Sequence, residues 1–173
     1  MRRSFVLFLL VVVLLFAFRG TDDIQDGTTI VQVGDKAPDF TAFTVEGKKV
    51  KLSHYQGKVV LINFFATWCG PCLRELPEIE NSMWRPYHEK GLVVLAVARE
   101  EDREKLQPFL RKVSLSFEVI PDPDREIYSL YAKQYIPRNF LVGRDGRVLY
   151  SNIGYTREGF RELVEHIQEA LTD

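Results

Sequence analysis

Two cysteines separated by two residues are the side chains best suited to chemistry in this chain of 173 residues, which has no others. Cys69 and Cys72 follow a strongly apolar run, and a helix is predicted to begin at or just after Cys69. At this spacing one disulfide can join the two sulfurs. The unpaired N–H groups at a helix start stabilise a thiolate. The sequence therefore predicts Cys69 as a nucleophile and Cys72, one turn into the helix, as the less exposed resolving thiol.

Three other uses of a cysteine pair fit the sequence less well. A structural zinc site needs four ligands, and the chain has neither a second cysteine pair nor a closely spaced pair among its three histidines. Covalent haem attachment needs a histidine directly after the second cysteine, where the chain has Leu73. A structural disulfide that closes so small a loop constrains the unfolded chain little. Redox chemistry without a metal or another cofactor is the predicted use.

The residues around the cysteines resemble the active site of thioredoxin-like proteins, which has the order Trp68-Cys69-Gly70-Pro71-Cys72 after an apolar strand. Glu75 and Pro77 extend this motif, and Asn63 stands where thioredoxin has a buried aspartate. Both features resemble the TlpA/ResA-type thiol-disulfide oxidoreductases. This group is membrane-anchored and extracytoplasmic, and it includes reductants of cytochrome c maturation. The similarity runs from about Val33 to the C-terminus.

The order of apolar and amphipathic segments fits the fold that this resemblance implies. We expect an α/β thioredoxin-like fold in which helices flank a mixed central sheet. A hairpin that turns at Glu46-Gly47 comes first, and a central strand and helix match an insertion of the TlpA/ResA group. The predicted strands cover residues 58–66, 92–98, 117–120, the segment that ends at 142, and 148–153. The predicted helices begin at 71, cover 101–112 and 125–131, and follow Thr156, with a turn at 121–124.

The helix after the cysteines is predicted to place its apolar side chains toward the core. Leu73, Leu76 and Ile79 recur at roughly helical spacing on that side. Pro77 lacks a backbone N–H, so the helix is expected to bend there. Pro86 and Gly91 indicate where the helix ends.

The resemblance also implies roles for residues outside the cysteine motif. Pro137 stands where thioredoxin-like folds have a cis-proline beside the dithiol, which leaves the backbone of Ile136 open to pair with an extended substrate. The aliphatic Ile136 is similar to thioredoxin, and the residue at this position tunes the redox potential. Arg138 departs from the threonine that is common after this proline. The predicted substrate-binding residues are Trp68, Gly70, Pro71, Ile136 and Pro137.

Glu75 is the candidate for proton transfer. It follows Cys72 by nearly one helical turn, and Asn63 cannot titrate, so Glu75 can exchange protons with the dithiol. The alternative is a solvated acid on the helix surface. Trp68 is expected to pack over the helix start as well as to contribute to the substrate site.

The N-terminus carries a predicted targeting segment. A basic start at Arg2 and Arg3 precedes an unbroken apolar run from Phe5 to Phe18, which indicates a signal peptide or signal anchor at residues 1–19. We favour an uncleaved anchor, because the end of the run lacks small residues at the spacing of a cleavage site. The two arginines then stay cytoplasmic and the remainder lies outside. A polar linker at 20–33 and a thioredoxin-like domain at 34–173 follow.

The predicted function is an extracytoplasmic thiol-disulfide oxidoreductase that reduces client proteins, for example apocytochrome c. The expected partners are clients with cysteine pairs or disulfides and a membrane thiol-disulfide electron donor, and the protein is expected to be a monomer. The formal net charge of −1 gives no reason to expect a nucleic acid partner. Two alternatives stay open on the same fold. A copper metallochaperone needs cysteines separated by three residues and a distant histidine, and a thiol peroxidase is suggested by the segment Val33-Gly34-Asp35-Lys36-Ala37-Pro38-Asp39-Phe40.

Overall fold

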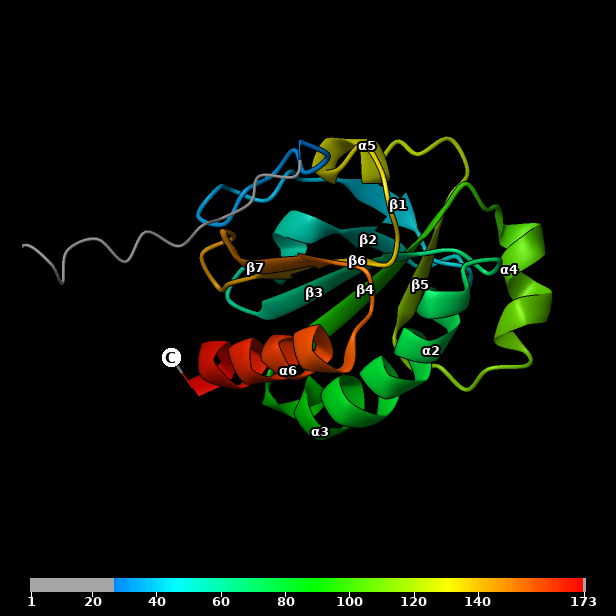
Figure 1. Ribbon diagram of the computed structural model, residues 1–173. Coiled ribbons are helices and arrows are strands. Elements are labelled where there is room, and N and C mark those ends of the chain that lie inside the picture. The colour runs from blue at the N-terminus through cyan, green and yellow to red at the C-terminus, as the bar shows by residue number, and fades with distance from the viewer. Residues whose placement is uncertain (1–26, 173) are drawn as a thin grey trace, which may run out of the picture.

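A five-stranded mixed sheet forms the centre of the computed structural model, which describes residues 27–172 (Figure 1). The strands are β3 (Val59–Phe65), β4 (Leu92–Arg99), β5 (Glu118–Asp122), β6 (Arg138–Val142) and β7 (Val148–Ile153), in the spatial order β5, β4, β3, β6, β7. Strands β3, β4 and β5 are parallel, and β6 and β7 are antiparallel to their neighbours. Since every residue of β3 is buried, its continuous apolar sequence suits the middle of a sheet covered on both faces.

Two helical layers and a hairpin cover this sheet. The helical segments are η1 (Leu52–Tyr55), α2 (Gly70–Ile79), η2 (Glu80–Trp84), α3 (Arg85–Tyr87), η3 (His88–Lys90), α4 (Arg103–Leu110), α5 (Tyr128–Tyr131) and α6 (Arg157–Thr172). Helices α2, α3 and α6 lie on one face of the sheet, and α5 lies on the other with the hairpin of β1 (Thr41–Phe43) and β2 (Lys49–Lys51) (Figure 1). The mixed sheet, flanking helices and hairpin confirm the predicted thioredoxin-like class.

Each face of the sheet has its own apolar core. On the α2 and α6 face, Leu61 and Phe65 of β3 belong to one cluster with Leu76 and Leu163. Alternation along the strand turns Phe64 to the opposite face, where it belongs to the cluster that covers the α5 side. Residues that share one face of β3 therefore meet α2, which begins with the two cysteines.

Helix α2 continues through Pro77 and passes into the π-helical segment η2. It differs from its prediction in the side chains that it buries. Leu73 is 40 % exposed and does not face the core. The buried side of the helix is formed by Cys72, Glu75, Leu76 and Ile79. Because Cys72 must enter the core to reach Cys69, the next residue is rotated about 100° away from it.

The helix of the central insertion is also shorter than the predicted helix at 125–131. Strand β5 runs through Asp122, so the turn predicted at 121–124 begins later, and α5 comprises Tyr128–Tyr131 only. The reason is the buried side chain of Asp122, which accepts hydrogen bonds from the N–H groups of Ile127 and Tyr128 at 3.1 and 2.9 Å. These bonds hold residues 123–127 as a loop rather than as helix. Pro121 is tolerated because β5 is an edge strand.

The last residues of the predicted linker are packed on the domain. The N–H groups of Ile30 and Val31 donate to the carbonyl oxygen of Tyr131, and Val31 is buried. Arg138 donates to the hydroxyl oxygens of Thr28 and Thr29. Residues 28–31 therefore lie over α5 and the start of β6 as part of the folded unit.

The predicted leader, residues 1–19, lies outside the described residues, as do residues 20–26 of the predicted linker. Among residues 27–172, no helix combines the length and the apolar composition needed to cross a membrane.

Candidate active site

A disulfide joins Cys69 and Cys72 at the start of α2, with the two Cα atoms 5.3 Å apart. Cys69 is the N-cap of the helix, and its Sγ accepts a hydrogen bond from the N–H of Cys72 at 3.3 Å. Cys69 is 6 % exposed and Cys72 is fully buried, which confirms that Cys72 is the less accessible sulfur. After reduction, a Cys69 thiolate is stabilised by this N–H group and by the positive end of the helix dipole.

The loop before β6 lies beside the disulfide. The peptide bond between Ile136 and Pro137 is cis, as predicted. Cys69 Sγ is 3.8 Å from the carbonyl oxygen of Ile136. The loop is held from both sides, because the Tyr128 hydroxyl donates to the carbonyl oxygen of Tyr135 at 2.8 Å and the Gly154 N–H donates to that of Pro137. A main-chain carbonyl is thus fixed next to the reactive sulfur.

Trp68 does not pack over the helix start as expected. Its side chain is 62 % exposed, and the Arg99 guanidinium lies 5.8 Å from its ring centroid. The same guanidinium lies 5.1 Å from the Tyr128 ring. Gly70 and Pro71 are exposed beside it. The indole therefore projects from the rim of the site with a cation, rather than the helix, against its ring.

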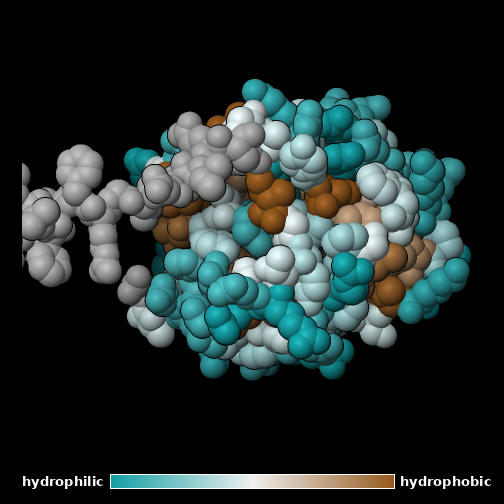
Figure 2. Space-filling view, viewed as in Figure 1, coloured by the Kyte–Doolittle hydropathy of each residue, from teal (hydrophilic) through white to brown (hydrophobic). Residues whose placement is uncertain are grey.

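Exposed apolar side chains occur beside the dithiol and elsewhere. On the face seen in Figure 2, strongly hydrophobic residues form small groups separated by hydrophilic ones. The large hydrophobic side chains that are exposed in the described residues are Ile30, Val33, Phe43, Trp68, Leu73, Leu130, Tyr135, Leu149 and Ile153. Trp68, Leu73 and Tyr135 are close in sequence to Cys69, Cys72 and Ile136, so they give the site an apolar border.

Glu75 is buried below the disulfide rather than solvated on the helix surface. It is 1 % exposed, and two amide groups donate to its carboxylate: Asn63 Nδ2 to Oε2 at 2.9 Å and Asn139 Nδ2 to Oε1 at 2.8 Å. Burial, opposed by these two hydrogen bonds, raises the pKa of Glu75 to about 7. A carboxyl group with this pKa can both accept and release a proton near neutral pH.

Glu101 supports the loop that leads into Cys69, a contact that the sequence analysis missed. Its buried carboxylate accepts hydrogen bonds from the Thr67 N–H at 2.8 Å and from the Thr67 hydroxyl. Glu101 follows β4, the parallel neighbour of β3. Since the carboxyl ends of adjacent parallel strands meet at one edge of a sheet, a polar residue directly after the second strand is a signal that could have identified it.

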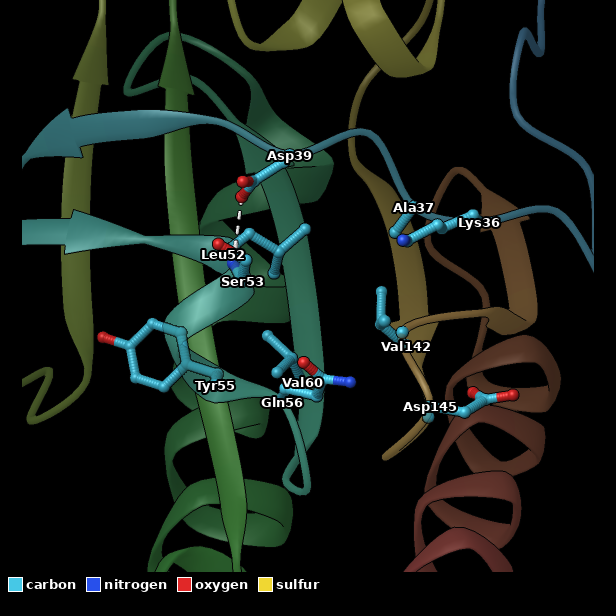
Figure 3. Close-up of a pocket in the computed structure, with 12 residues that line it drawn as sticks. Lys36, Ala37, Asp39, Leu52, Ser53, Tyr55, Gln56, Val60, Val142 and Asp145 are labelled. Carbon is cyan, nitrogen blue, oxygen red and sulfur yellow. Dashed lines mark hydrogen bonds between the residues drawn. The ribbon is translucent and has the colours of Figure 1, made fainter.

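A cavity of about 150 Å³ lies away from the cysteines (Figure 3). Its lining includes Val60 at the beginning of β3, Val142 at the end of β6, and Asp39, Ser53 and Tyr55. The dithiol follows the other end of β3, about 17 Å along the strand by its rise per residue. This cavity is therefore separate from the candidate active site.

No group of three or more histidine, cysteine, aspartate or glutamate side chains within residues 27–172 is arranged to hold a metal ion. The functional groups that the structure places at this site are the Cys69–Cys72 disulfide, the buried carboxyl group of Glu75 and the main chain of the loop before β6.

Known proteins resemble this chain in sequence. The model of the AhpC/TSA family matches residues 33–151. The thiol-disulfide oxidoreductase ResA of Bacillus cereus is 34 % identical over 142 residues, which cover 82 % of this chain and 80 % of ResA. ResA of Geobacillus thermodenitrificans is 33 % identical over 141 residues, 81 % of this chain and 80 % of that protein.

Solved structures agree with these relatives. A candidate protein disulfide isomerase from Bacteroides thetaiotaomicron superposes with a TM-score of 0.81 at 35 % identity and covers 84 % of this chain and 94 % of its own. A candidate thiol:disulfide interchange protein DsbE from Chlorobium tepidum has a TM-score of 0.76 at 37 % identity, with 82 % and 99 % covered. With a disulfide at the start of α2 and a cis-proline beside it, the chain belongs to the AhpC/TSA family and is a ResA-like thiol-disulfide oxidoreductase with the thioredoxin-like fold.

Proposed function

We propose that the protein reduces disulfides of client proteins outside the cytoplasm, with cytochrome c maturation and its apocytochrome client as the leading case. The observation that carries this proposal is the placement of Cys69: it caps α2, and its sulfur lies 3.8 Å from the carbonyl oxygen that precedes Pro137. A client segment that pairs with the main chain of the half-buried Ile136 brings its disulfide to the sulfur. Trp68, Gly70, Pro71, Ile136 and Pro137 form the proposed client-binding surface.

The proposed reaction has two exchange steps. The Cys69 thiolate attacks one sulfur of the client disulfide, a Cys69–client bond forms, and the other client sulfur leaves as a thiolate that takes up a proton. The Cys72 thiol then gives its proton to the Glu75 carboxylate and attacks Cys69 Sγ, which releases the second client thiolate. Glu75 passes its proton on to this second thiolate, and the proton taken up by the first comes from solvent. The client thereby gains two electrons and two protons, and the Cys69–Cys72 disulfide is restored. A membrane thiol-disulfide donor reduces that disulfide for the next cycle.

The direction of electron flow is tested by the redox potential. Because Ile136 resembles the residue of thioredoxin at this position, we expect a potential nearer to about −270 mV than to about −120 mV, the value of a strong oxidant. Equilibration of the full chain in glutathione or dithiothreitol buffers, followed by the fluorescence of Trp68, measures it. A variant with both cysteines replaced by alanine corrects for the response of Trp84. A potential near the oxidant value contradicts a reductase.

The proposed location is the outer side of the cytoplasmic membrane, with residues 1–19 as an uncleaved anchor and the domain as a monomer. The basic start followed by an apolar run supports this orientation. The ResA-type resemblance supports it as well, since that group is membrane-anchored.

The location predicts which thiols a membrane-impermeant maleimide reaches in intact cells. We expect Cys69 of the reduced protein to be labelled without lysis, because the domain faces outward. A matched control carries Ser4→Cys together with Cys69→Ala and Cys72→Ala, and its thiol is expected to react only after lysis. Labelling of Cys69 only after lysis places the domain inside and contradicts the proposal.

A further inference from the structure

The carboxylate of Glu75 is held in a closed ring of hydrogen bonds. Asn63 Nδ2 donates to Glu75 Oε2 at 2.9 Å and to Asn139 Oδ1 at 2.8 Å, and Asn139 Nδ2 donates to Glu75 Oε1 at 2.8 Å. All three residues are essentially inaccessible to solvent. Each carboxylate oxygen is therefore paired with an amide donor, and each amide is oriented by the other.

The sheet register creates this ring. Asn63 of β3 lies directly opposite Asn139 of β6, and Asn139 lies opposite Asn152 of β7. Side chains that are opposite one another across strands share a face, so the three asparagines form a row. Two of them meet Glu75, which reaches down from α2. Leu61, Phe65 and Leu141 surround the row as apolar members of the same core.

Two opposing effects act on Glu75 in this place. Burial favours the neutral acid, and the nearby charge of Glu78 on the same helix acts in the same direction. The two amide donors favour the carboxylate. Tyr155, in the loop between β7 and α6, is a further titratable group that interacts with Glu75. Cys72 lies nearly one turn before Glu75 on α2. None of these groups is a cation that could offset the cost of burying the Glu75 charge. The two amides are therefore the groups that stabilise the charged carboxylate.

We propose that Asn139, together with Asn63, is a positioning residue that holds the Glu75 carboxylate and stabilises its charged form, so that the acid can receive a proton from the dithiol and release it again. The inference rests on the proposed function of Glu75 as the proton acceptor. Without the amide donors, the buried acid keeps its proton at neutral pH and cannot accept another. With them, protonation of Glu75 turns an O–H toward an amide N–H, which limits how tightly the proton is held.

The test measures proton binding to Glu75 in the oxidised full-length chain, where the cysteines do not titrate. The carbonyl stretch of protonated carboxyl groups is followed by infrared difference spectroscopy across pH, and its loss in Glu75→Gln assigns the signal. We expect the midpoint of Asn139→Leu to lie about one pH unit or more above that of the parent, because a charged acceptor has lost a donor. Asn139→Val, whose β-branched side chain suits a strand, is expected to shift in the same direction and serves if the leucine variant does not fold.

The matched control is Asn152→Leu, which removes the next amide in the row without removing a bond to Glu75, and its midpoint is expected to stay with the parent. Midpoints for both Asn139 variants that equal the parent value, or a shift as large in Asn152→Leu, overturn the proposal. The infrared titration requires no disulfide exchange. A shifted midpoint in a protein that fails to reduce clients therefore contradicts the proposed function alone, and an unshifted midpoint in an active reductase contradicts the amide assignment alone.

Discussion

Replacing Cys72 with alanine is expected to make the protein accumulate as mixed disulfides with its clients, whereas Cys69→Ala is expected to form none. Cys69 caps α2, so its thiolate is stabilised by the helix N-terminus, while Cys72 is fully buried and can act only on a sulfur already bound to Cys69. Turnover is expected to fall by at least about three orders of magnitude in either variant, because both sulfurs are needed to complete a cycle.

Non-reducing electrophoresis and mass spectrometry of the trapped species identify the clients. Alkylation rates across pH on the two single-cysteine variants provide the control, and the Cys69 thiol is expected to react faster with a pKa below the free value of about 8.5. Faster labelling of Cys72, or mixed disulfides formed by Cys69→Ala, reverses the assignment of nucleophile and resolving thiol.

Glu75→Gln is expected to change the pH dependence of client reduction while the fold stays intact. The parent carboxyl group has a pKa raised to about 7 by burial, so it titrates within the range in which the dithiol reacts. The variant cannot accept a proton from Cys72, and its resolving step is expected to slow most above pH 7, where the parent acid is ionised. Stopped-flow fluorescence of Trp68 from about pH 5 to 9 follows the reaction through the usual carboxyl and thiol ranges.

The same substitution is expected to alter how stability depends on pH. The folded acid binds its proton more tightly than the unfolded one, whose pKa is about 4.5. Between these two values the folded state holds a proton that the unfolded state has released, so stability falls as pH rises from about 4.5 to about 7. The raised pKa corresponds to a loss of about 3 kcal/mol across that window. Glu75→Gln lacks this loss.

Denaturant unfolding of the oxidised parent and variant at pH 4.5, 6 and 8 checks the expectation. Glu104→Gln is the control, because Glu104 is exposed on α4 and is not among the groups that shift the pKa of Glu75. Kinetic profiles and stability curves that coincide for Glu75→Gln and the parent remove Glu75 from the proton-transfer role and leave the chemistry to Cys69, Cys72 and the loop at Pro137.

Much of the site follows from local sequence. Val59–Phe65 is so uniformly apolar that only a strand covered on both faces accommodates it, and Cys69 and Pro71 after it suit the start of a helix. The order of the two cysteines in that helix determines which sulfur is accessible. The role of Pro137 was predicted from the resemblance to thioredoxin-like proteins, and its peptide bond is cis as that resemblance implies.

Other parts depended on which segments pack together. Leu73 was predicted to be buried because it is apolar, but the entry of Cys72 into the core sets the rotation of α2 and leaves Leu73 outside. Trp68 was predicted to cover the helix start, but the loop before it is bonded to Glu101 through Thr67, and the indole projects outward with Arg99 against its ring.

The sequence by itself determined the thiol-disulfide chemistry and the fold class, since these follow from motifs of residues that are neighbours in the chain, and it predicted Cys69 as the nucleophile. Only the tertiary structure decided how Glu75, the proposed proton acceptor, is held. Asn63 and Asn139 are 76 residues apart, and no periodicity within either strand indicates that they pair. Their meeting depends on the β3–β6 register, where a slip of one residue would turn Asn139 to the α5 face and leave the Glu75 carboxylate without one of its two donors.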